Sequence, residues 1–491
     1  MKNYALNLKD LKLTFNNQLV IFLFNRYISY VLLFIRGLLI ARFLGPYFFG
    51  IWGFSTLILQ YLSYSNIGIN YAITVQLSTK TNNEERERDR IASTALSSMF
   101  FIGIILLILG ALLYFCGWIP FSRFNFPNYW LVIILITIAS NIQQVLINIF
   151  RVKKNILRIA ITEFVTALLL FISVFVDKNS SLINIQLITI LCTSLISIFL
   201  MSYKLPIKFS LRFDKLIFLD QLKLGIPLLI YNLSFTLINL SSTSIVSAFY
   251  SVEILGFFTL ANSISSATLL GLQSIGWAFY PQVLTNTSAD ITNQGKYQIV
   301  GKINTLYATS CFILTIFVVL ILPAIFLVLP EYKIASPVII ILVISQAILS
   351  ASYGFNALAV SNQKQKNIAI IGISVVIVIT LLSLCVPILH MDKIWIAIVV
   401  LVGSFIYSFL QIRLGTQLLQ INENLLREFL KLYPIGVLCS FFLLIISSFT
   451  KYSFLLSVFA LGIYLFFNRK NNKIIFNFIK TKIVVKVKQY E

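Results

Sequence analysis

The chain has 491 residues, of which 59% are hydrophobic and only 11% are charged, and its formal net charge is +22. Apolar runs of about 20 residues recur from end to end, which excludes a soluble domain. Because these runs are continuous rather than alternating in polarity, they exclude a β-barrel as well. The basic residues are dispersed among short loops, so we attribute the positive charge to membrane orientation and expect no nucleic-acid partner.

Residues for metal or thiol chemistry are scarce. The five cysteines are widely spaced, and the one histidine, His390, lies at the end of an apolar run. The sequence contains no Cys-x-x-Cys pair, no other metal-ligand spacing and no Walker-type phosphate loop. We therefore expect neither a cofactor nor a metal, and no ATP hydrolysis by this chain.

The apolar runs predict an all-α polytopic membrane protein with about 14 transmembrane helices. We expect them at about 18–41, 47–76, 91–115, 129–150, 159–176, 183–203, 223–249, 255–284, 303–328, 337–360, 368–389, 394–412, 433–450 and 453–468. An even count places both termini on one side, and most of the 38 lysines and arginines lie in the termini and loops of that side. The positive-inside rule then predicts a multi-pass membrane protein with both termini in the cytoplasm.

The loops divide this chain into segments. The stretch 211–224 places its apolar residues on one helical face, as expected for a helix lying in the cytoplasmic interface. The basic C-terminal tail is expected to contact anionic membrane lipid. The predicted organisation is an N-terminal lobe of spans 1–6 (residues 1–203), an amphipathic connector (204–222), a C-terminal lobe of spans 7–12 (223–412), spans 13 and 14 (413–468) and a basic cytoplasmic tail (469–491).

A weak internal repeat supports two lobes. An offset of 206 residues aligns Phe43 with Phe249 and Gly50 with Gly256. Both copies begin with the chain travelling outward, so the repeat is parallel, with its axis along the membrane normal.

The first expected span carries two arginines, Arg26 and Arg36. A charge near the middle of a membrane helix costs about 2.5–3.5 kcal/mol on insertion scales, so we expect both groups to face water or an anion. Asn25 and Tyr30 share the polar face of Arg26. The alternatives are an ion pair to a neighbouring helix for Arg26 and snorkelling to the surface for Arg36. Arg42 lies in the following turn, and we expect it to be an interfacial anchor.

Glu163 is the one acidic residue deep inside an expected span. An intramembrane carboxylate is a candidate for coupling transport to a cation or proton. The alternative is a salt bridge to Arg26 or Arg36 that makes both charges tolerable.

Polar residues of spans two, seven and eight are candidates for lining a cavity. In span two, Tyr64 and Asn66 are candidates for binding sugars by stacking and hydrogen bonding, and helix–helix packing is the alternative. The corresponding polar residues of spans seven and eight are Asn232, Asn239, Ser241, Ser242, Asn262 and Gln273. Gly225–Pro227, Gly276 and Pro281 are candidate bend points, because proline removes a backbone hydrogen bond within a helix.

Short motifs in both halves carry a family resemblance. The segments 41–46 (ARFLGP), 49–52 (FGIW) and 66–68 (NIG), with 222–227 (LKLGIP) and 254–261 (ILGFFTLA) in the second half, resemble the bacterial polysaccharide-unit (O-antigen, Wzx-type) flippases. These belong to the multidrug/oligosaccharidyl-lipid/polysaccharide exporter superfamily. The resemblance covers nearly the whole chain and also matches Arg36 to an arginine in the cavity of related lipid flippases.

This resemblance implies two six-helix lobes around a central cavity, with two further C-terminal helices. It implies a transporter, not an enzyme, that moves undecaprenyl-pyrophosphate-linked oligosaccharide across the inner membrane by alternating access. The polymer built from these oligosaccharides would be O-antigen or another surface polysaccharide. A polysaccharide polymerase and a chain-length regulator would be further partners of the protein. The alternative is a cation-coupled multidrug exporter of the same superfamily, which needs embedded carboxylates. Two arginines against the single Glu163 argue against it.

Overall fold

The structure, a computed structural model, describes residues 17–79, 85–116, 122–153, 155–203, 205–210, 213–288, 292–421, 424–450 and 453–473. Most of the expected basic tail (469–491) lies outside these residues. The α-helices are α1 (Asn17–Leu62), α2 (Ile69–Thr79), α3 (Glu85–Phe115), α4 (Trp130–Val152), α5 (Ile156–Ile172), α6 (Leu182–Ser202), α7 (Lys215–Phe249), α8 (Val252–Ser288), α9 (Asn293–Val328), α10 (Ser336–Ala351), α11 (Tyr353–Ser361), α12 (Gln365–Ile388), α13 (Ile394–Leu418), α14 (Leu425–Leu432), α15 (Ile435–Ser447) and α16 (Ser453–Phe467). Short 3-10 helices include η2 (Ser63–Asn66), η6 (Ser173–Phe175) and η7 (Pro330–Ala335).

The predicted all-α membrane fold is confirmed, but the count of about 14 spans is not. Within the described residues, 11 helices are long and apolar enough to cross a membrane, or 12 if the bent pair α14–α15 is one span. One cause is that α1 joins the first two expected spans across a kink, so that they count as one helix of 46 residues. The second is that α16, with 15 residues, is shorter than an ordinary span.

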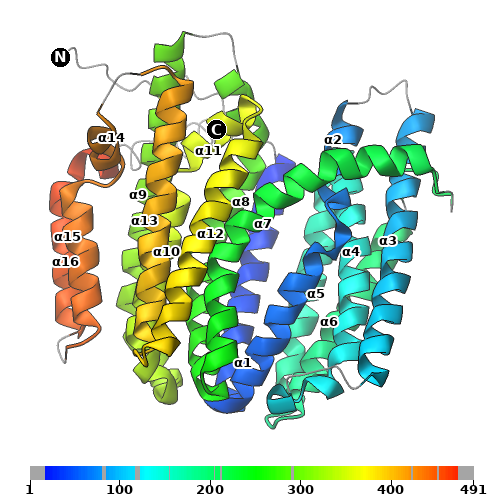
Figure 1. The fold of residues 1–491 in the computed structure, drawn as a ribbon, viewed down its shortest axis with the longest axis horizontal. Coiled ribbons are helices and arrows are strands. Elements are labelled where there is room, and N and C mark those ends of the chain that lie inside the picture. Colours follow the sequence, from blue (N-terminus) through cyan, green and yellow to red (C-terminus); the bar gives the residue numbers. More distant parts are fainter. Residues whose placement is uncertain are drawn as a thin grey trace, which may run out of the picture.

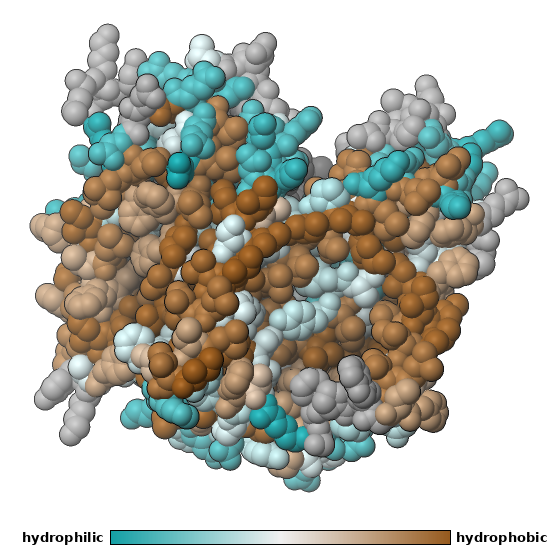
Figure 2. Space-filling model, viewed as in Figure 1, coloured by the Kyte–Doolittle hydropathy of each residue, from teal (hydrophilic) through white to brown (hydrophobic). Residues whose placement is uncertain are grey.

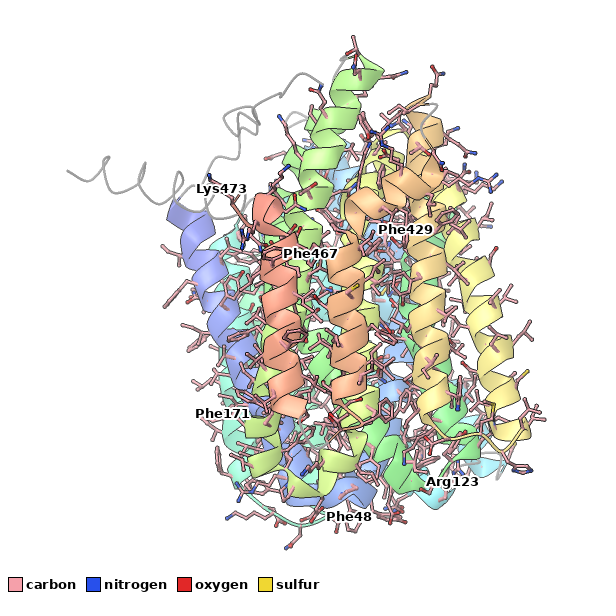
Figure 3. The ribbon with its side chains drawn as sticks, turned by 90° about the vertical axis from the view of Figure 1, so that its left-hand side faces the viewer. Phe48, Arg123, Phe171, Phe429, Phe467 and Lys473 are labelled. Carbon is pink, nitrogen blue, oxygen red and sulfur yellow. The ribbon has the colours of Figure 1, made fainter. Side chains whose placement is uncertain are left out.

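The kink in α1 lies at Gly45, whose φ of 64° and ψ of 173° depart from helical values. Glycine accepts a positive φ without a Cβ clash, and the following Pro46 has no N–H to leave unbonded. The chain therefore reverses here, and Figure 1 shows the two halves of α1 meeting at the bottom of the molecule. We call this the hairpin end. The opposite end, where α1 begins and Lys473 lies, is the termini end (Figure 3).

The helices form two groups that lie side by side in Figure 1. The N-terminal group is α1–α6 and the C-terminal group is α7–α13, with α15 and α16 packed against each other at the far edge of the latter. Helix α1 contacts α5 in its own group and α8 in the other. The space between the groups is therefore bordered by α1.

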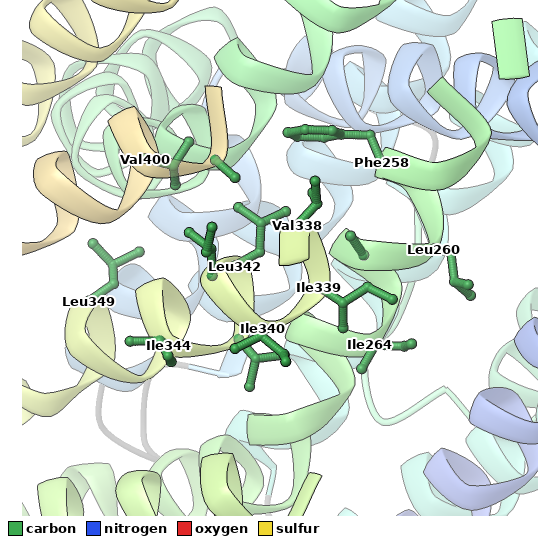
Figure 4. Packing of buried hydrophobic residues seen from close by; sticks show 14 of the residues in the cluster. Phe258, Leu260, Ile264, Val338, Ile339, Ile340, Leu342, Ile344, Leu349 and Val400 are labelled. Atoms are coloured by element: carbon green, nitrogen blue, oxygen red, sulfur yellow. The ribbon is translucent and has the colours of Figure 1, made fainter. Parts of the chain in front are cut away.

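The C-terminal group is centred on α10. This helix is apolar on all sides and almost every residue of it is buried, as expected for a helix surrounded by others. It packs against α8, α9 and α13, and Figure 4 shows Ile339 and Leu342 of α10 beside Phe258 of α8 and Val400 of α13.

The outside of the molecule is apolar across its middle. Figure 2 shows a broad hydrophobic belt between hydrophilic bands at the two ends, which matches a bilayer with water on both sides. Exposed apolar side chains make up the belt; on α3 they are Phe100, Phe101, Ile104, Ile105, Ile108, Leu109, Leu112, Leu113, Tyr114 and Phe115. These results support a multi-pass membrane protein.

The last part of the expected connector (204–222) forms the beginning of α7. Asp214 caps α7 by accepting hydrogen bonds from the backbone N–H groups of Leu216 and Ile217, and it accepts another from Arg90 Nη2 at 2.6 Å. The N–H of Ile217 and the Arg90 guanidinium lower the pKa of Asp214, so the cap is charged at neutral pH. Gln221 then donates to the carbonyl of Ile91 at 3.1 Å, which holds this part of α7 on α3.

At the hairpin end the two groups touch through glycines. A Cβ on Gly50 would lie 1.9 Å from the carbonyl oxygen of Val252, and one on Gly256 would lie 2.0 Å from that of Pro46. The offset of 206 residues that aligns Gly50 with Gly256 also aligns Pro46 with Val252. The two contacts are therefore reciprocal, as in an isologous interface, and support the internal repeat.

This packing predicts a stability difference between two glycines of α1. Gly50→Ala places a methyl group against the Val252 carbonyl, whereas Gly37 has nothing within 4 Å of an added Cβ. We expect Gly50→Ala to lower the melting temperature of the purified protein in detergent by several degrees, and Gly37→Ala to leave it unchanged or raise it, because alanine is the better helix former. Equal melting temperatures for the two variants would contradict this packing.

Candidate functional site

Arg26 forms an ion pair inside the N-terminal group. Its Nε lies 3.4 Å from Oε2 of Glu163 on α5, and both side chains are largely buried, with 19% and 26% of their surfaces exposed. The structure thus shows the salt bridge that the sequence analysis named as the alternative for Arg26 and Glu163. Attraction between opposite charges is strong where water is sparse, so the pair makes both charges tolerable inside the membrane.

Aromatic rings surround this ion pair. The Arg26 guanidinium lies 5.3 Å from the centre of the Phe22 ring and 5.8 Å from that of Tyr30, within cation–π range. Tyr30 accepts a hydrogen bond from Ser274 of α8 at 3.0 Å, so the site on α1 is linked to the C-terminal group. Asn25 precedes Arg26 and is half-buried.

A third charged residue, which the sequence analysis missed, belongs to this region. Arg151, in the last turn of α4, is half-buried and interacts electrostatically with Arg26. Two arginines near one glutamate leave the region with an excess of positive charge. Arg151 carries little signal in the sequence, because a basic residue at a helix end is ordinary for a cytoplasmic boundary.

Arg36 lies at a separate place, nearer the hairpin end. Its Nε donates to Oε1 of Gln186 on α6 at 2.9 Å, and Gln186 donates in turn to Ser173 of η6 at 3.0 Å. The ring of Trp52 lies 5.6 Å from the Arg36 guanidinium. Nη2 is buried and has no hydrogen-bond partner among the described residues, and no carboxylate forms a salt bridge with Arg36 there. Arg36 is therefore a buried cation held by neutral groups, with hydrogen-bonding capacity to spare.

Tyr64 and Asn66 lie at a third place, between the end of α1 and α2. Tyr64 donates to Thr236 of α7 at 2.7 Å and so joins the two groups. Asn66 is buried, and its amide bonds to the carbonyl of Ser63 and the N–H of Gly68. Both polar ends of the Asn66 amide therefore stabilise the turn that precedes α2.

The candidate residues thus lie at three places: a cluster around Arg26, the site of Arg36, and the turn that holds Tyr64 and Asn66. Asn25, Arg26, Tyr30 and Glu163 lie together near the termini end, while Arg36 is about 15 Å further along α1, at 1.5 Å per residue. The middle parts of the C-terminal helices carry no charged residue at all. The described residues contain no group of three or more histidines, cysteines or acids that could hold a metal.

The sequence from residue 15 to residue 285, more than half of the chain, matches the model of a family described as "Polysaccharide biosynthesis protein". The chain belongs to this family. No curated protein matches the sequence.

Solved structures place this polysaccharide biosynthesis protein in a known fold. The lipid II flippase MurJ, in an inward closed conformation, superposes with a TM-score of 0.68 at 17% identity, over 93% of this chain and 100% of that one. A multidrug-resistance MATE transporter of the MOP superfamily gives a TM-score of 0.57 at 14% identity in its inward-facing form, over 83% of this chain and 96% of that one. An outward-facing MATE structure gives 0.51 at 14% identity, over 82% and 93%. The fold is that of the MOP superfamily of transporters.

The ion pair predicts a non-additive effect on stability. Glu163→Gln alone leaves the Arg26 guanidinium partly buried beside Arg151 without its carboxylate, so we expect a clear drop in melting temperature. Adding Arg26→Gln removes the stranded charge and should recover part of that drop. The check is a double-mutant cycle of the single variants and the double variant in detergent. Strictly additive shifts would mean that the two side chains do not interact.

Proposed function

We propose that this protein is a flippase that moves lipid-linked oligosaccharides from one leaflet of the membrane to the other. The family match and the MOP fold support a flippase or exporter. The observation that carries the choice of substrate is the sign of the charge inside the membrane. The N-terminal group holds Arg26 and Arg36 there against the single Glu163, so its interior suits an anion. The diphosphate of undecaprenyl-diphosphate-linked sugars is such an anion, and guanidinium groups bind phosphate oxygens well.

A path for this head group is needed because burying its charges and hydroxyl groups in hydrocarbon is prohibitive, whereas the prenyl chain is soluble in lipid. The two helix groups touch at the hairpin end, where Tyr332 of η7 donates to the carbonyl of Ala41 at 3.1 Å. Figure 2 shows the surface hollowed between the groups at the termini end. If the termini are cytoplasmic, the substrate enters from the inner leaflet, and rocking of the groups exposes it to the other side.

Arg26 and Arg36 would act in sequence in this scheme. Arg26, near the open end, meets the diphosphate first, and Arg36, about 15 Å along the helix, receives it as the carrier turns. Asn25, Tyr30 and Tyr64 would contact the sugars next to it. Glu163 would replace the diphosphate as the partner of Arg26 in the empty carrier. A role for Glu163 in cation or proton coupling is compatible with this, since protonation would release Arg26.

The second candidate is a cation-coupled multidrug exporter, because MATE transporters share the fold. Such a protein would have to attract cationic drugs. The charges of the membrane interior, two arginines against one glutamate that is already paired, favour an anionic substrate instead. An inner-membrane location, anionic lipid, a polysaccharide polymerase and a chain-length regulator complete the proposal, with O-antigen as one surface polymer that it would serve.

The test is to express variants in a strain that lacks the protein and to measure its surface polysaccharide. We expect Arg26→Ala and Arg36→Ala to abolish the polymer and to cause lipid-linked oligosaccharide to accumulate on the inner leaflet. Arg42→Ala is the matched control, because it removes an arginine of the same helix that is exposed in the turn. It should leave the polymer at its normal level.

Normal polysaccharide in both Arg26→Ala and Arg36→Ala strains, with the proteins present in the membrane, would contradict the proposal. Increased drug sensitivity of these strains without loss of polysaccharide would favour the exporter.

A further inference from the structure

Helix α4 carries a polar stripe, a row of polar residues on one face, to which the proposed function assigns no role. Ser140, Gln144, Asn148 and Arg151 follow one another at intervals of three or four residues and so share one face of the helix. The opposite face packs into the core of the N-terminal group through Ile142, Val145, Leu146, Ile149 and Phe150. The stripe therefore points away from that core.

The stripe does not face lipid. Gln144 is exposed in the middle of the helix, and in hydrocarbon an exposed amide without partners costs several kcal/mol. Within α4, which is described throughout, Leu131 at the hairpin end is the one exposed large hydrophobic residue. The neighbouring α3, by contrast, exposes a long row of such residues and is a lipid-facing helix. Gln144 thus faces water inside the protein.

The contacts on the two sides of the stripe show where in the protein this water-filled space lies. On one flank, Asn141 donates to Ser65 at 3.0 Å and Asn148 donates to the carbonyl of Asn70 at 2.8 Å, so α4 adjoins η2 and α2. On the other flank α4 contacts α1, which carries Arg26. Because α1 contacts α8 and α2 contacts α7, the face of α4 between them is turned toward the C-terminal group. The stripe borders the space between the two groups.

We propose that the hydroxyl and amide groups of Ser140, Gln144 and Asn148 bind the sugar hydroxyls of the substrate while the arginines at the end of the stripe hold its diphosphate. This assignment rests on the proposed function and adds the orientation of the substrate: the lipid diphosphate toward the termini end, and the first sugars along α4 toward the hairpin end. Amides suit this task because each offers a donor and an acceptor to neutral hydroxyl groups.

In the described part of the C-terminal group, several amides are engaged with neighbouring side chains; Asn262 of α8, for example, donates to Thr243 of α7 at 2.8 Å. The central α10 of this group is almost wholly buried, and its amide, Gln346, accepts a hydrogen bond from Asn239 of α7 at 3.0 Å. The intramembrane charges of Arg26, Arg36 and Glu163 and the exposed amide of Gln144 all lie in the N-terminal group. Sugar selection on this side leaves the C-terminal group free to close over the bound substrate.

The experiment measures binding of two lipids to the purified full-length protein. One is undecaprenyl diphosphate without sugar, and the other is the lipid-linked oligosaccharide extracted from a strain that lacks the protein. We expect Gln144→Leu to weaken binding of the glycosylated lipid about tenfold, the value of one or two hydrogen bonds, and to leave undecaprenyl diphosphate unchanged. Arg26→Ala should weaken both. Gln143→Leu is the matched control, since Gln143 lies about 100° around the helix and is half-buried.

Unchanged binding of the glycosylated lipid by Gln144→Leu would overturn the sugar assignment. So would an equal loss for both lipids, or the same loss in Gln143→Leu, because these would indicate a general effect on α4. A wild-type protein that binds neither lipid would overturn the proposed function itself. This result can be told apart from the three outcomes that overturn only the sugar assignment.

Discussion

A guanidinium group inside a bilayer needs a counter-charge, hydrogen-bond acceptors or water, and this constraint organises the N-terminal group. Arg26 meets it through Glu163 on α5 and through the rings of Phe22 and Tyr30. Arg36 meets it through neutral groups only, a chain of hydrogen bonds to Gln186 and Ser173. The two sites differ in what they can offer a ligand. In the proposed function the first would exchange Glu163 for the diphosphate of the substrate. The second offers Nη2 of Arg36, which has no hydrogen-bond partner among the described residues.

The contacts between the groups are of two kinds, and their chemistry suggests how the groups could separate. At the hairpin end, glycines allow backbone to touch backbone, with Tyr332 packed edge-on against Phe49 and Phe257. Away from that end, the described contacts include hydrogen bonds of tyrosine, such as Tyr61 to Ser244 at 2.7 Å and Tyr27 to the carbonyl of Gly271 at 3.0 Å. They also include a second close backbone approach, where a Cβ on Gly68 would lie 2.2 Å from the carbonyl oxygen of Gly225. A tyrosine hydrogen bond of this kind contributes only about 1 kcal/mol net, because water replaces it readily. The tyrosine contacts can therefore open without a large barrier.

The sequence predicted the fold class, the reversal at Gly45 and the unusual charges of α1, because hydropathy, glycine–proline chemistry and buried arginines are local signals. It left open whether Glu163 pairs with Arg26, since pairing depends on how α1 and α5 pack. The count of about 14 spans is not confirmed, because the two halves of α1 form one kinked helix, α14 and α15 form a bent pair and α16 is short. The polar stripe of α4 was not identified from the sequence. Its residues recur at helical spacing, but many isoleucines lie between them and make the helix look like an ordinary apolar span.

The central claim is that cations inside the membrane recognise the diphosphate of a lipid. The most direct measurement compares undecaprenyl diphosphate, undecaprenyl phosphate and undecaprenol as ligands of the purified protein by native mass spectrometry. Because Arg26 and Arg36 bind through charge, the account predicts that affinity falls in that order and that the order disappears when both arginines are replaced by glutamine. Equal binding of the three lipids by the wild-type protein would contradict it.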